Sequence, residues 1–359
     1  MRIAFFTTGM TRGGAERVIA TLSNQLVQMG HEALIIMLKG QKSEYRLDEK
    51  VKLLSANLDA GMRNAPAAMR FYCRTVRAEH PDVVIAFTLK PNLMTCLAKT
   101  ALRLKTPLII SERANPFQRR ESIQLLCNKL FRVADLNVCQ SKVISCYYEG
   151  GINAVPSIVI PNPIDEACIA DKPSARRGNF IISVGRLCKQ KRQDLAIRAF
   201  AEIASLHPGL RLKICGEGEA FDHLQILASE LDVGGSVDFC GSVNNVMRTY
   251  SDAAAYLMTS DFEGFPNALI EAIASGIPVV STDFSPGVAR ELVHDGVNGY
   301  VVPAGDVLAV KAGLERILAN EPDRRRLEQS ACAVRERFAL DKIAGEWLMA
   351  CNLVIEGSR

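Results

Sequence analysis

Short apolar runs rich in β-branched residues alternate with longer amphipathic stretches along almost the whole chain, and this alternation limits the possible folds more than any other feature. Parallel sheets with crossover helices produce this pattern, because a helix must return the chain to the same end of the sheet before the next parallel strand begins. The sequence therefore predicts an α/β protein with doubly wound, Rossmann-like sheets.

A polar stretch interrupts the alternation near the middle of the 359 residues, and the alternation starts again at Phe180. The stretch opens at Asn162 and ends at Gly178. Two domains of ordinary size agree with this length. We predict a first domain over residues 1–164, a linker over 165–178, a second domain over 179–340 and a final amphipathic helix over 341–359.

Each domain has its own series of predicted elements, and residues 39–64 are the least readable region. In the first domain the pattern predicts strands at Ile3–Thr7, Ala33–Leu38, Val83–Phe87, Leu108–Ser111, Leu136–Val138 and Ile158–Ile160, and helices at Ala15–Met29, Ala65–Glu79, Asn92–Leu104 and Gln124–Val133. In the second domain it predicts strands at Phe180–Val184, Arg211–Cys215, Val237–Cys240, Ala255–Met258 and Pro278–Ser281.

Charge is divided unevenly between the two halves. Residues 1–164 hold 22 Lys and Arg against 12 Asp and Glu, which is +10, and residues 165–359 hold 21 against 27, which is −6. A basic half is typical of a surface that meets an anionic partner. The eleven cysteines form no C-x-x-C pair, which favours a reduced, cytoplasmic compartment. No apolar run approaches the roughly 18 residues that span a bilayer, and the first residues do not resemble a signal peptide.

Two carboxylates, Glu263 and Glu271, stand with seven residues between them around a predicted helix start. Glu263 is expected on the loop after a strand, and Glu271 about two turns into the helix, at roughly 3.6 residues per turn. Backbone N–H groups at a helix start favour an anion, and here they belong to Phe265, Asn267 and Ala268. Hydroxyl-binding carboxylates beside a phosphate site suit a nucleotide-sugar, whereas the plain alternative is a pair of solvated helix glutamates.

Two cations follow the first predicted strand of the second domain. Arg186 and Lys191 stand five residues apart in the loop after Phe180–Val184. Fixed cations at that position can neutralise a diphosphate leaving group, and such electrostatic stabilisation is often the largest catalytic contribution. Lys189 or Arg192 could share the role, and the alternative is that all are ordinary surface cations.

Taken together, these motifs resemble those of the GT-B retaining glycosyltransferases of family 4, over nearly the whole chain. The match includes Gly13-Gly14-Ala-Glu-Arg17 after the first strand, Cys215-Gly-Glu-Gly218, and Gly241-Ser-Val243. For Gly13 and Gly14 a plain tight turn stays open, and a dinucleotide fold is disfavoured because G-x-G-x-x-G is absent. The resemblance implies a GT-B fold, in which two Rossmann-like domains face a central cleft and a C-terminal helix crosses back to the first domain.

The resemblance also implies a role for each matched residue. Glu263 would hold the donor sugar, Glu271 the ribose, and Arg186 and Lys191 the diphosphate, so that Arg186, Lys191 and Glu263 are the expected catalytic residues. The other implied donor-binding positions are Gly14, Gly216, Glu217, Gly241, Val243, Gly264, Phe265, Pro266 and Asn267.

Acceptor-side residues are expected in the first domain, at Gly13, Glu112, Arg113 and Asn115. Relatives often place a histidine where Arg113 stands. Arg113 could bind an acceptor phosphate or the donor sugar, but it cannot act as a base because it stays protonated.

Three arginines mark the predicted helix 65–79. Arg70, Arg74 and Arg77 follow i, i+4 and i+7 spacing, which places them on one face. The plain interpretation is a solvated basic face. The sharper one is an acceptor-side surface for anionic headgroups or a lipid-linked diphosphate, since related lipid-glycan transferases carry a basic helix at this position.

The implied function is the transfer of a hexose or N-acetylhexosamine from a nucleotide-diphosphate sugar, with UDP expected, to a polyprenyl-diphosphate-linked glycan in bacterial surface polysaccharide or O-antigen synthesis. No D-x-D pair occurs, so we expect no metal and no other cofactor. The expected mechanism retains the anomeric configuration. The expected location is peripheral, on the cytoplasmic face of the inner membrane, with no nucleic-acid partner. A GT-B nucleotide-sugar 2-epimerase and a non-catalytic nucleotide-sugar-binding subunit are the alternatives.

Overall fold

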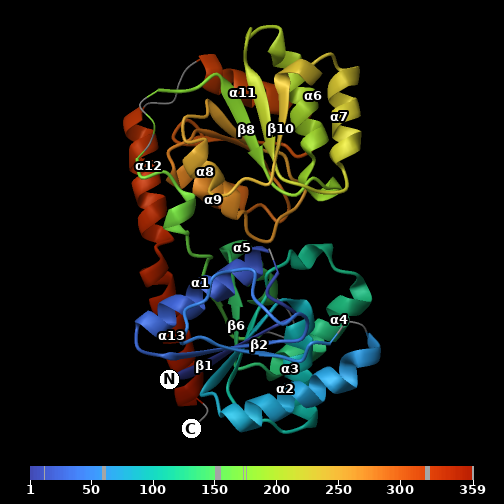
Figure 1. Ribbon diagram of the computed structural model, residues 1–359, viewed down its shortest axis with the longest axis vertical. Helices are drawn as coiled ribbons and strands as arrows, with labels where there is room; N and C mark the ends of the chain where they lie inside the picture. The colour runs from blue at the N-terminus through green and yellow to red at the C-terminus, as the bar shows by residue number, and fades with distance from the viewer. Residues whose placement is uncertain are drawn as a thin grey trace. The chain divides into compact units, whose positions relative to one another are not determined.

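The computed structural model describes residues 1–11, 13–58, 62–149, 155–172, 174, 176–319 and 324–357 (Figure 1). The chain forms two compact units. The first unit comprises Met1–Pro163 together with Ala339–Arg359, and the second comprises Ile164–Phe338.

The first unit is built on a seven-stranded sheet in the order β3-β2-β1-β4-β5-β6-β7, with every neighbouring pair parallel. The strands are β1 (Arg2–Thr7), β2 (Glu32–Met37), β3 (Lys52–Ser55), β4 (Val83–Phe87), β5 (Leu108–Ser111), β6 (Leu136–Cys139) and β7 (Ser157–Val159). The helices between them are α1 (Gly14–Gln28), α2 (Ala65–Glu79), α3 (Leu89–Ala101), α4 (Glu121–Leu130) and α5 (Lys142–Glu149).

Both faces of this sheet are buried, which explains why its central strands are continuously apolar. Along β1, Ile3 and Phe5 enter one hydrophobic cluster and Ala4 and Phe6 enter the other. The last helix, α13 (Leu340–Gly357), belongs to the first of these clusters together with α1. Its Trp347 is buried and stacks on Phe87 with ring centroids 5.7 Å apart.

The second unit has a six-stranded parallel sheet in the order β10-β9-β8-β11-β12-β13. Its strands are β8 (Phe180–Val184), β9 (Arg211–Cys215), β10 (Val237–Gly241), β11 (Ala255–Met258), β12 (Val279–Thr282) and β13 (Gly299–Val302). Its helices are α6 (Gln193–Ala204), α7 (Phe221–Glu230), α8 (Val246–Thr249), α9 (Asn267–Ala274), α10 (Ala289–Leu292), α11 (Val307–Ala319) and α12 (Arg324–Arg337).

The strand order reverses between β1 and β4 in the first unit and between β8 and β11 in the second. In open α/β sheets, ligands bind beyond the carboxyl ends of the strands at such a switch point. The predicted cations follow β8 and the predicted Glu263 follows β11, so both motifs lie at the switch point of the second unit.

The prediction of a linker over residues 165–178 is wrong for its first half. Ile169 is buried in a core cluster of the second unit together with Ile164, which directly precedes the segment, and Ala170 donates its backbone N–H to Ser275 Oγ at 3.1 Å. The stretch lacks periodicity because only a short 3₁₀ turn, Glu166–Cys168, organises it, yet its one isoleucine, Ile169, is part of the core.

The other predicted elements agree with the structure to different degrees. The strands β3 and β13 and the helix α5 were not expected from the pattern, and α3 and α4 each begin three residues before their predicted starts, at Leu89 and Glu121. Among the described helices, none is both long and apolar enough to cross a bilayer.

Candidate active site

Lys191 and Glu263 form an ion pair at the carboxyl ends of β8 and β11. Lys191 Nζ lies 2.6 Å from Glu263 Oε1, and the carboxylate is nearly buried, with 6% of the residue exposed. Ser260 donates its hydroxyl to the same oxygen at 2.6 Å. Two of the three residues with predicted catalytic roles are therefore in direct contact, although 72 positions separate them in the sequence.

Hydrogen bonds lock the two loops that carry this pair. Thr259, directly after β11, donates its hydroxyl to the carbonyl of Arg192 at 2.8 Å, and Gln190 donates its side-chain amide to the carbonyl of Phe262 at 2.8 Å. The backbone N–H of Glu263 donates to Ser285 O at 3.0 Å. Since both loops are fixed to each other and to the segment after β12, the ion pair is held in place before any ligand arrives.

Glu271, like Glu263, acts electrostatically on the buried phenol of Tyr256. Burial and, to a lesser extent, these two carboxylates raise the pKa of Tyr256 well above its usual value. The helix α9 begins at Asn267, so Glu271 lies about one turn into it, and the prediction of about two turns is wrong.

The start of α9 differs in one respect from the predicted anion site. The backbone N–H of Asn267 donates to Phe265 O at 3.1 Å, and so it is not open to a phosphate. Pro266, the residue before the helix, is buried, and Gly264 and Phe265 are half-buried. Phe265 packs edge-on against Phe338 with centroids 6.0 Å apart.

Arg186 is an exposed cation of the site, as is Lys189 in the same loop. The side chain of Arg186 has no hydrogen bond or ion pair with any described residue, while its carbonyl accepts a hydrogen bond from Gln193 Nε2 at 2.8 Å. By contrast, Arg192 is tied to Asp194 and to Asp261, at 3.0 and 3.1 Å. The side chain of Arg186 is therefore available to bind a ligand, whereas that of Arg192 is held by ion pairs within the protein.

Two glycines after β9 are required by packing. A Cβ atom at Gly216 would collide with the carbonyl oxygen of Gly185, and one at Gly218 would collide with that of Leu187. Both glycines have a positive φ, +146° and +158°. The sequence pattern thus reflects the close approach of two strand-end loops, with exposed Glu217 between the glycines. Gly241, the last residue of β10, accepts a hydrogen bond from Gly216 N at 2.8 Å, and Val243 packs against a neighbouring core cluster.

In the first unit, Gly13 and Gly14 begin α1, but Gly13 is already bonded. The hydroxyl of Tyr45 accepts from Gly13 N at 3.1 Å and donates to Gly13 O at 2.9 Å. Tyr45 was missed, because it lies in the region 39–64, the least readable part of the sequence. Gly13, predicted on the acceptor side, therefore has its N–H and C=O groups bonded to Tyr45, whereas Gly14, predicted at the donor, is exposed.

Glu112 is a structural residue in this arrangement. Its Oε1 accepts hydrogen bonds from the backbone of Arg113 and Ala114, each at 3.1 Å, and its Oε2 pairs with the guanidinium of Arg119. The carboxylate is fully buried, so the prediction that it contacts an acceptor does not fit. Arg119, which the sequence reasoning missed, is its buried partner, and no spacing signal linked the two.

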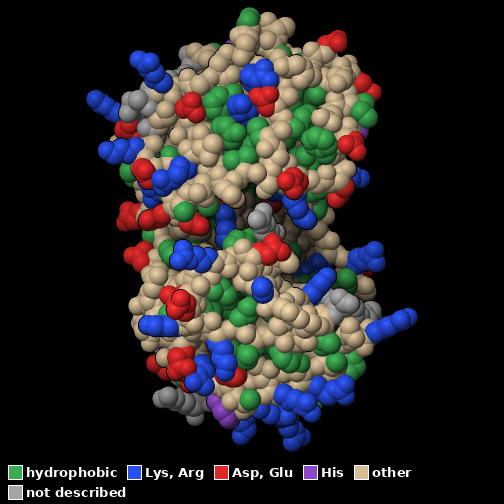
Figure 2. Space-filling view, in the orientation of Figure 1, with side chains coloured by type: hydrophobic (Ala, Val, Ile, Leu, Met, Phe, Trp, Pro, Cys, Tyr) green, Lys and Arg blue, Asp and Glu red, His purple; other side chains and the backbone are tan. Residues whose placement is uncertain are grey.

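The remaining acceptor-side residues lie in two places. Arg113 and Asn115 follow β5, and Asn115 caps a short 3₁₀ turn by accepting from Phe117 N at 3.0 Å. Arg70, Arg74 and Arg77 lie on the exposed face of α2, opposite the buried Tyr72 and Val76. Figure 2 shows Lys and Arg side chains gathered at the end of the first unit where Figure 1 draws α2.

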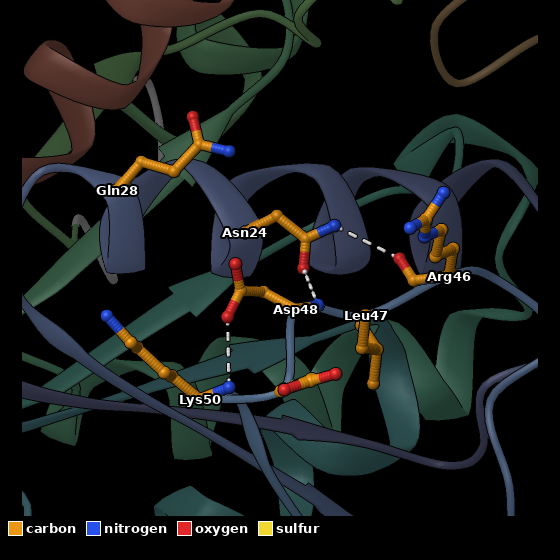
Figure 3. Close-up of a pocket in the computed structure, with 7 residues that line it drawn as sticks. Asn24, Gln28, Arg46, Leu47, Asp48 and Lys50 are labelled. Atoms are coloured by element: carbon orange, nitrogen blue, oxygen red, sulfur yellow. Dashed lines mark hydrogen bonds between the residues drawn. The ribbon is translucent and has the colours of Figure 1, made fainter.

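A surface pocket between α1 and the segment before β3 holds none of the predicted residues (Figure 3). Its polar groups bond one another: Asn24 accepts from Asp48 N at 2.8 Å and donates to Arg46 O at 3.0 Å. The segment enters β3 at its amino end, away from the strand ends that carry the motifs. Within the described ranges, no three His, Cys, Asp or Glu residues are grouped as metal ligands.

Two family models cover most of the chain. The first, described as Glycosyltransferase Family 4, matches residues 12–167, and the second, described as Glycosyl transferases group 1, matches residues 166–333. A Campylobacter jejuni relative is 30% identical over 365 residues, which is 97% of this chain and 98% of the relative. The chain belongs to the family 4 glycosyltransferases. The resemblance in the sequence motifs is thereby confirmed.

The relatives of this glycosyltransferase are transferases themselves. The Campylobacter protein just described is an N-acetylgalactosamine-N,N′-diacetylbacillosaminyl-diphospho-undecaprenol 4-α-N-acetylgalactosaminyltransferase. A second protein from the same organism, 28% identical over 97% of each chain, is an α-1,4-N-acetyl-D-galactosaminyltransferase that acts on a glycan linked to diphospho-undecaprenol. Nothing in these relatives supports the epimerase alternative.

Solved structures share the fold of this glycosyltransferase. Anabaena Alr3699/HepE in complex with UDP and glucose superposes with a TM-score of 0.81 at 19% identity, over 98% of this chain and 99% of that one. The galactosyltransferase WaaB gives a TM-score of 0.77 at 22% identity, over 98% and 99%. The predicted α/β class with two Rossmann-like domains of the GT-B fold is confirmed.

Proposed function

We propose that this glycosyltransferase moves a hexose or N-acetylhexosamine from a UDP-sugar to a glycan linked to a polyprenyl diphosphate, in bacterial surface polysaccharide synthesis. The Lys191–Glu263 pair beside the open Arg186 is the observation that carries the proposal. A buried carboxylate can accept sugar hydroxyls, and cations beside it can hold the diphosphate. The names of the two Campylobacter relatives and the UDP complex of the Anabaena protein support the choice of acceptor and nucleotide.

The site suits departure of the diphosphate without a metal. The ammonium of Lys191 has three donors, so it can keep its bond to Glu263 and still donate to a phosphate oxygen. Arg186 would meet the charge that develops on the leaving group. Preorganised cations of this kind act where charge appears in the transition state.

The proposal includes retention of configuration by attack on the face that the diphosphate leaves. Glu263 is the carboxylate that a double displacement would use as nucleophile. Its Oε1 accepts from both Lys191 and Ser260, which lowers its nucleophilicity and fixes it as a binding group. The acceptor hydroxyl would then attack the anomeric carbon, the bond to the diphosphate oxygen would break, and a phosphate oxygen would take the hydroxyl proton.

The test is a panel of UDP- and GDP-sugars, scored for nucleotide release with and without a polyprenyl-diphosphate-linked glycan. We expect slow release from one or a few UDP-sugars and a large increase when the acceptor is present. Product with inverted configuration would overturn the retaining mechanism, and binding of UDP without any release would favour a non-catalytic subunit.

Removal of divalent metal is expected to leave turnover unchanged. The reason is that Arg186 and Lys191, in the proposed site, would neutralise the diphosphate in place of a metal ion. The measurement is the initial rate in excess EDTA, with an added Mn²⁺ or Mg²⁺ series as control. Loss of activity in chelator, restored by either ion, would contradict this prediction.

We also propose that the enzyme is peripheral on the cytoplasmic face of the inner membrane. The exposed arginines of α2 support this, because basic side chains are attracted to anionic headgroups by about 1 kcal/mol each near the surface. Two leucines of α4 add apolar exposure in the same unit, Leu125 at 64% and Leu126 at 46%. Exposed cations and exposed apolar residues are both features of surfaces that bind at a membrane interface.

Replacing Arg70, Arg74 and Arg77 together with Gln is expected to weaken binding to vesicles that contain anionic lipid and to raise KM for a polyprenyl-linked acceptor. Slow donor hydrolysis should stay intact, because these residues lie on the exposed face of α2 and not at the strand ends. The matched control replaces the same three residues with Lys, which keeps the charge and should keep vesicle binding. Unchanged binding and acceptor kinetics in the Gln variant would identify an ordinary solvated face.

A further inference from the structure

Arg113 is held in an unusual environment at the carboxyl edge of the first unit's sheet. Its guanidinium carbon lies 4.4 Å from the ring centroid of Phe87, the last residue of β4, and 5.6 Å from that of Trp347 on α13. Its Nη1 donates to Asn162 Oδ1 at 2.6 Å. Two aromatic rings and one amide therefore fix the plane of the guanidinium group.

The positive charge of Arg113 has no counter-charge within the part of the chain that the structure describes. Nε and Nη2 are buried and have no hydrogen-bond partner there, and Arg113 forms no ion pair. The neighbouring carboxylate, Glu112, is committed to Arg119 and to two backbone N–H groups. Burial lowers the pKa of Arg113 to about 9, so the group is still a cation at neutral pH.

The two unpartnered nitrogens form one edge of the guanidinium. Nε–H and Nη2–H are parallel, and this edge binds two oxygens of a carboxylate or a phosphate at once. Gln140, which follows β6, donates to the same Asn162 oxygen at 3.0 Å, and its own Oε1 is buried without a described partner. A buried two-pronged donor and a nearby buried acceptor thus lie together at the edge where α/β sheets bind ligands.

A purely structural cation would not be expected to have this arrangement. An uncompensated buried charge destabilises the folded protein, and unpaired buried N–H groups add to that cost. Asn162 would keep the bond from Gln140 if Arg113 were absent. The environment of Arg113 is therefore better explained by a bound anion, which supplies the missing counter-charge and accepts the unpaired N–H groups.

We propose that the Nε–Nη2 edge of Arg113 binds an oxyanion of the acceptor, either a phosphate or a sugar carboxylate. Asn162 positions the guanidinium, and Phe87 and Trp347 support its face. The inference rests on the proposed function only in assigning the anion to the acceptor. The anion site itself follows from the first unit alone.

The sole tryptophan of the chain, Trp347, provides a direct probe. Its fluorescence is titrated with inorganic pyrophosphate, with glucuronate and with neutral glucose, all in the presence of saturating UDP so that Arg186 and Lys191 are already occupied. Two variants change the site: Arg113→Met removes the charge, and Arg113→Lys keeps the charge but lacks the two parallel N–H groups. Arg132→Met is the control, because Arg132 is exposed.

We expect one of the two anions, but not glucose, to change the fluorescence of the wild type and of Arg132→Met. Arg113→Met and Arg113→Lys should bind at least about tenfold more weakly, the scale of lost hydrogen bonds to a charged group. A stronger response to pyrophosphate identifies a phosphate ligand, and a stronger response to glucuronate identifies a carboxylate. Without an anion, Arg113→Met should melt at the wild-type temperature or above it.

No response to either anion, or a response equal in all variants, overturns the inference. A marked fall in the melting temperature of Arg113→Met, together with no anion response in the wild type, would assign Arg113 a structural role. A separate UDP titration distinguishes this outcome from failure of the proposed function. If UDP binds and is released from a UDP-sugar while the anion response is absent, only the Arg113 site is wrong.

Discussion

Alanine at Arg186 or at Lys191 is expected to lower kcat/KM by roughly 10²-fold or more, the scale of losing one preorganised electrostatic donor. Both side chains leave the loop after β8, where Arg186 is exposed and Lys191 is bonded to Glu263. Their contribution should grow as charge develops on the departing diphosphate, so the loss should fall mainly on kcat. The measurement is steady-state kinetics with the preferred UDP-sugar and a lipid-linked acceptor.

Two control variants test whether the loss of activity is specific to Arg186 and Lys191. Arg198→Ala removes an exposed arginine from α6 and should leave kinetics unchanged. Arg192→Ala removes a cation that Asp194 and Asp261 already neutralise, and it should cost much less than Arg186→Ala. Near-normal turnover of both Arg186→Ala and Lys191→Ala would show that the diphosphate binds elsewhere.

The second large effect concerns the Lys191–Glu263 pair itself. Glu263→Gln keeps the shape of the side chain but leaves Lys191, whose side chain is 19% exposed, without its counter-charge. Breaking one partner of a largely buried pair costs about 3 kcal/mol or more in the free energy of unfolding. Activity should fall as well, since the amide replaces a charged acceptor for sugar hydroxyls.

A double-mutant cycle separates the two effects. Lys191→Met and Glu263→Gln should each destabilise the protein in urea unfolding, and the double variant should be less destabilised than their sum by about 1 kcal/mol or more, as contacting residues show. Strict additivity would mean that the contact contributes nothing to folding. Recovery of stability without recovery of activity in the double variant would show that the pair also has a catalytic role.

The sequence predicted central strands well because both faces of these sheets are buried. The strands β4, β5, β8, β9 and β11 have the predicted bounds. β4 is a continuous apolar run, which makes the position of a strand plain, whereas β9 alternates apolar with charged residues. The missed strands are edge strands. β3 has no fully buried residue, and β13 begins with a glycine and is half-buried in its middle, so neither has a distinct apolar signature.

The site was predictable only where a motif stays within one loop. Arg186 and Lys191 share the loop after β8, and Glu263 and Glu271 share the segment from β11 into α9. Contacts between loops are not encoded by spacing. Tyr45 bonds to Gly13, and Arg119 bonds to Glu112. Each bond occupies a group that was predicted to face a ligand, and neither contact is visible before the chain is folded.

The return of α13 to the first unit affects the order in which the protein can mature. The second unit is one continuous segment, Ile164–Phe338, whereas the first needs Trp347 and its neighbours to fill the core beneath Phe87. During synthesis, the first unit therefore cannot complete its core until α13, the last helix, has been made. The second unit is able to fold before that. A premature stop after residue 338 would leave the second unit whole and would damage the first unit, although the first unit begins the chain.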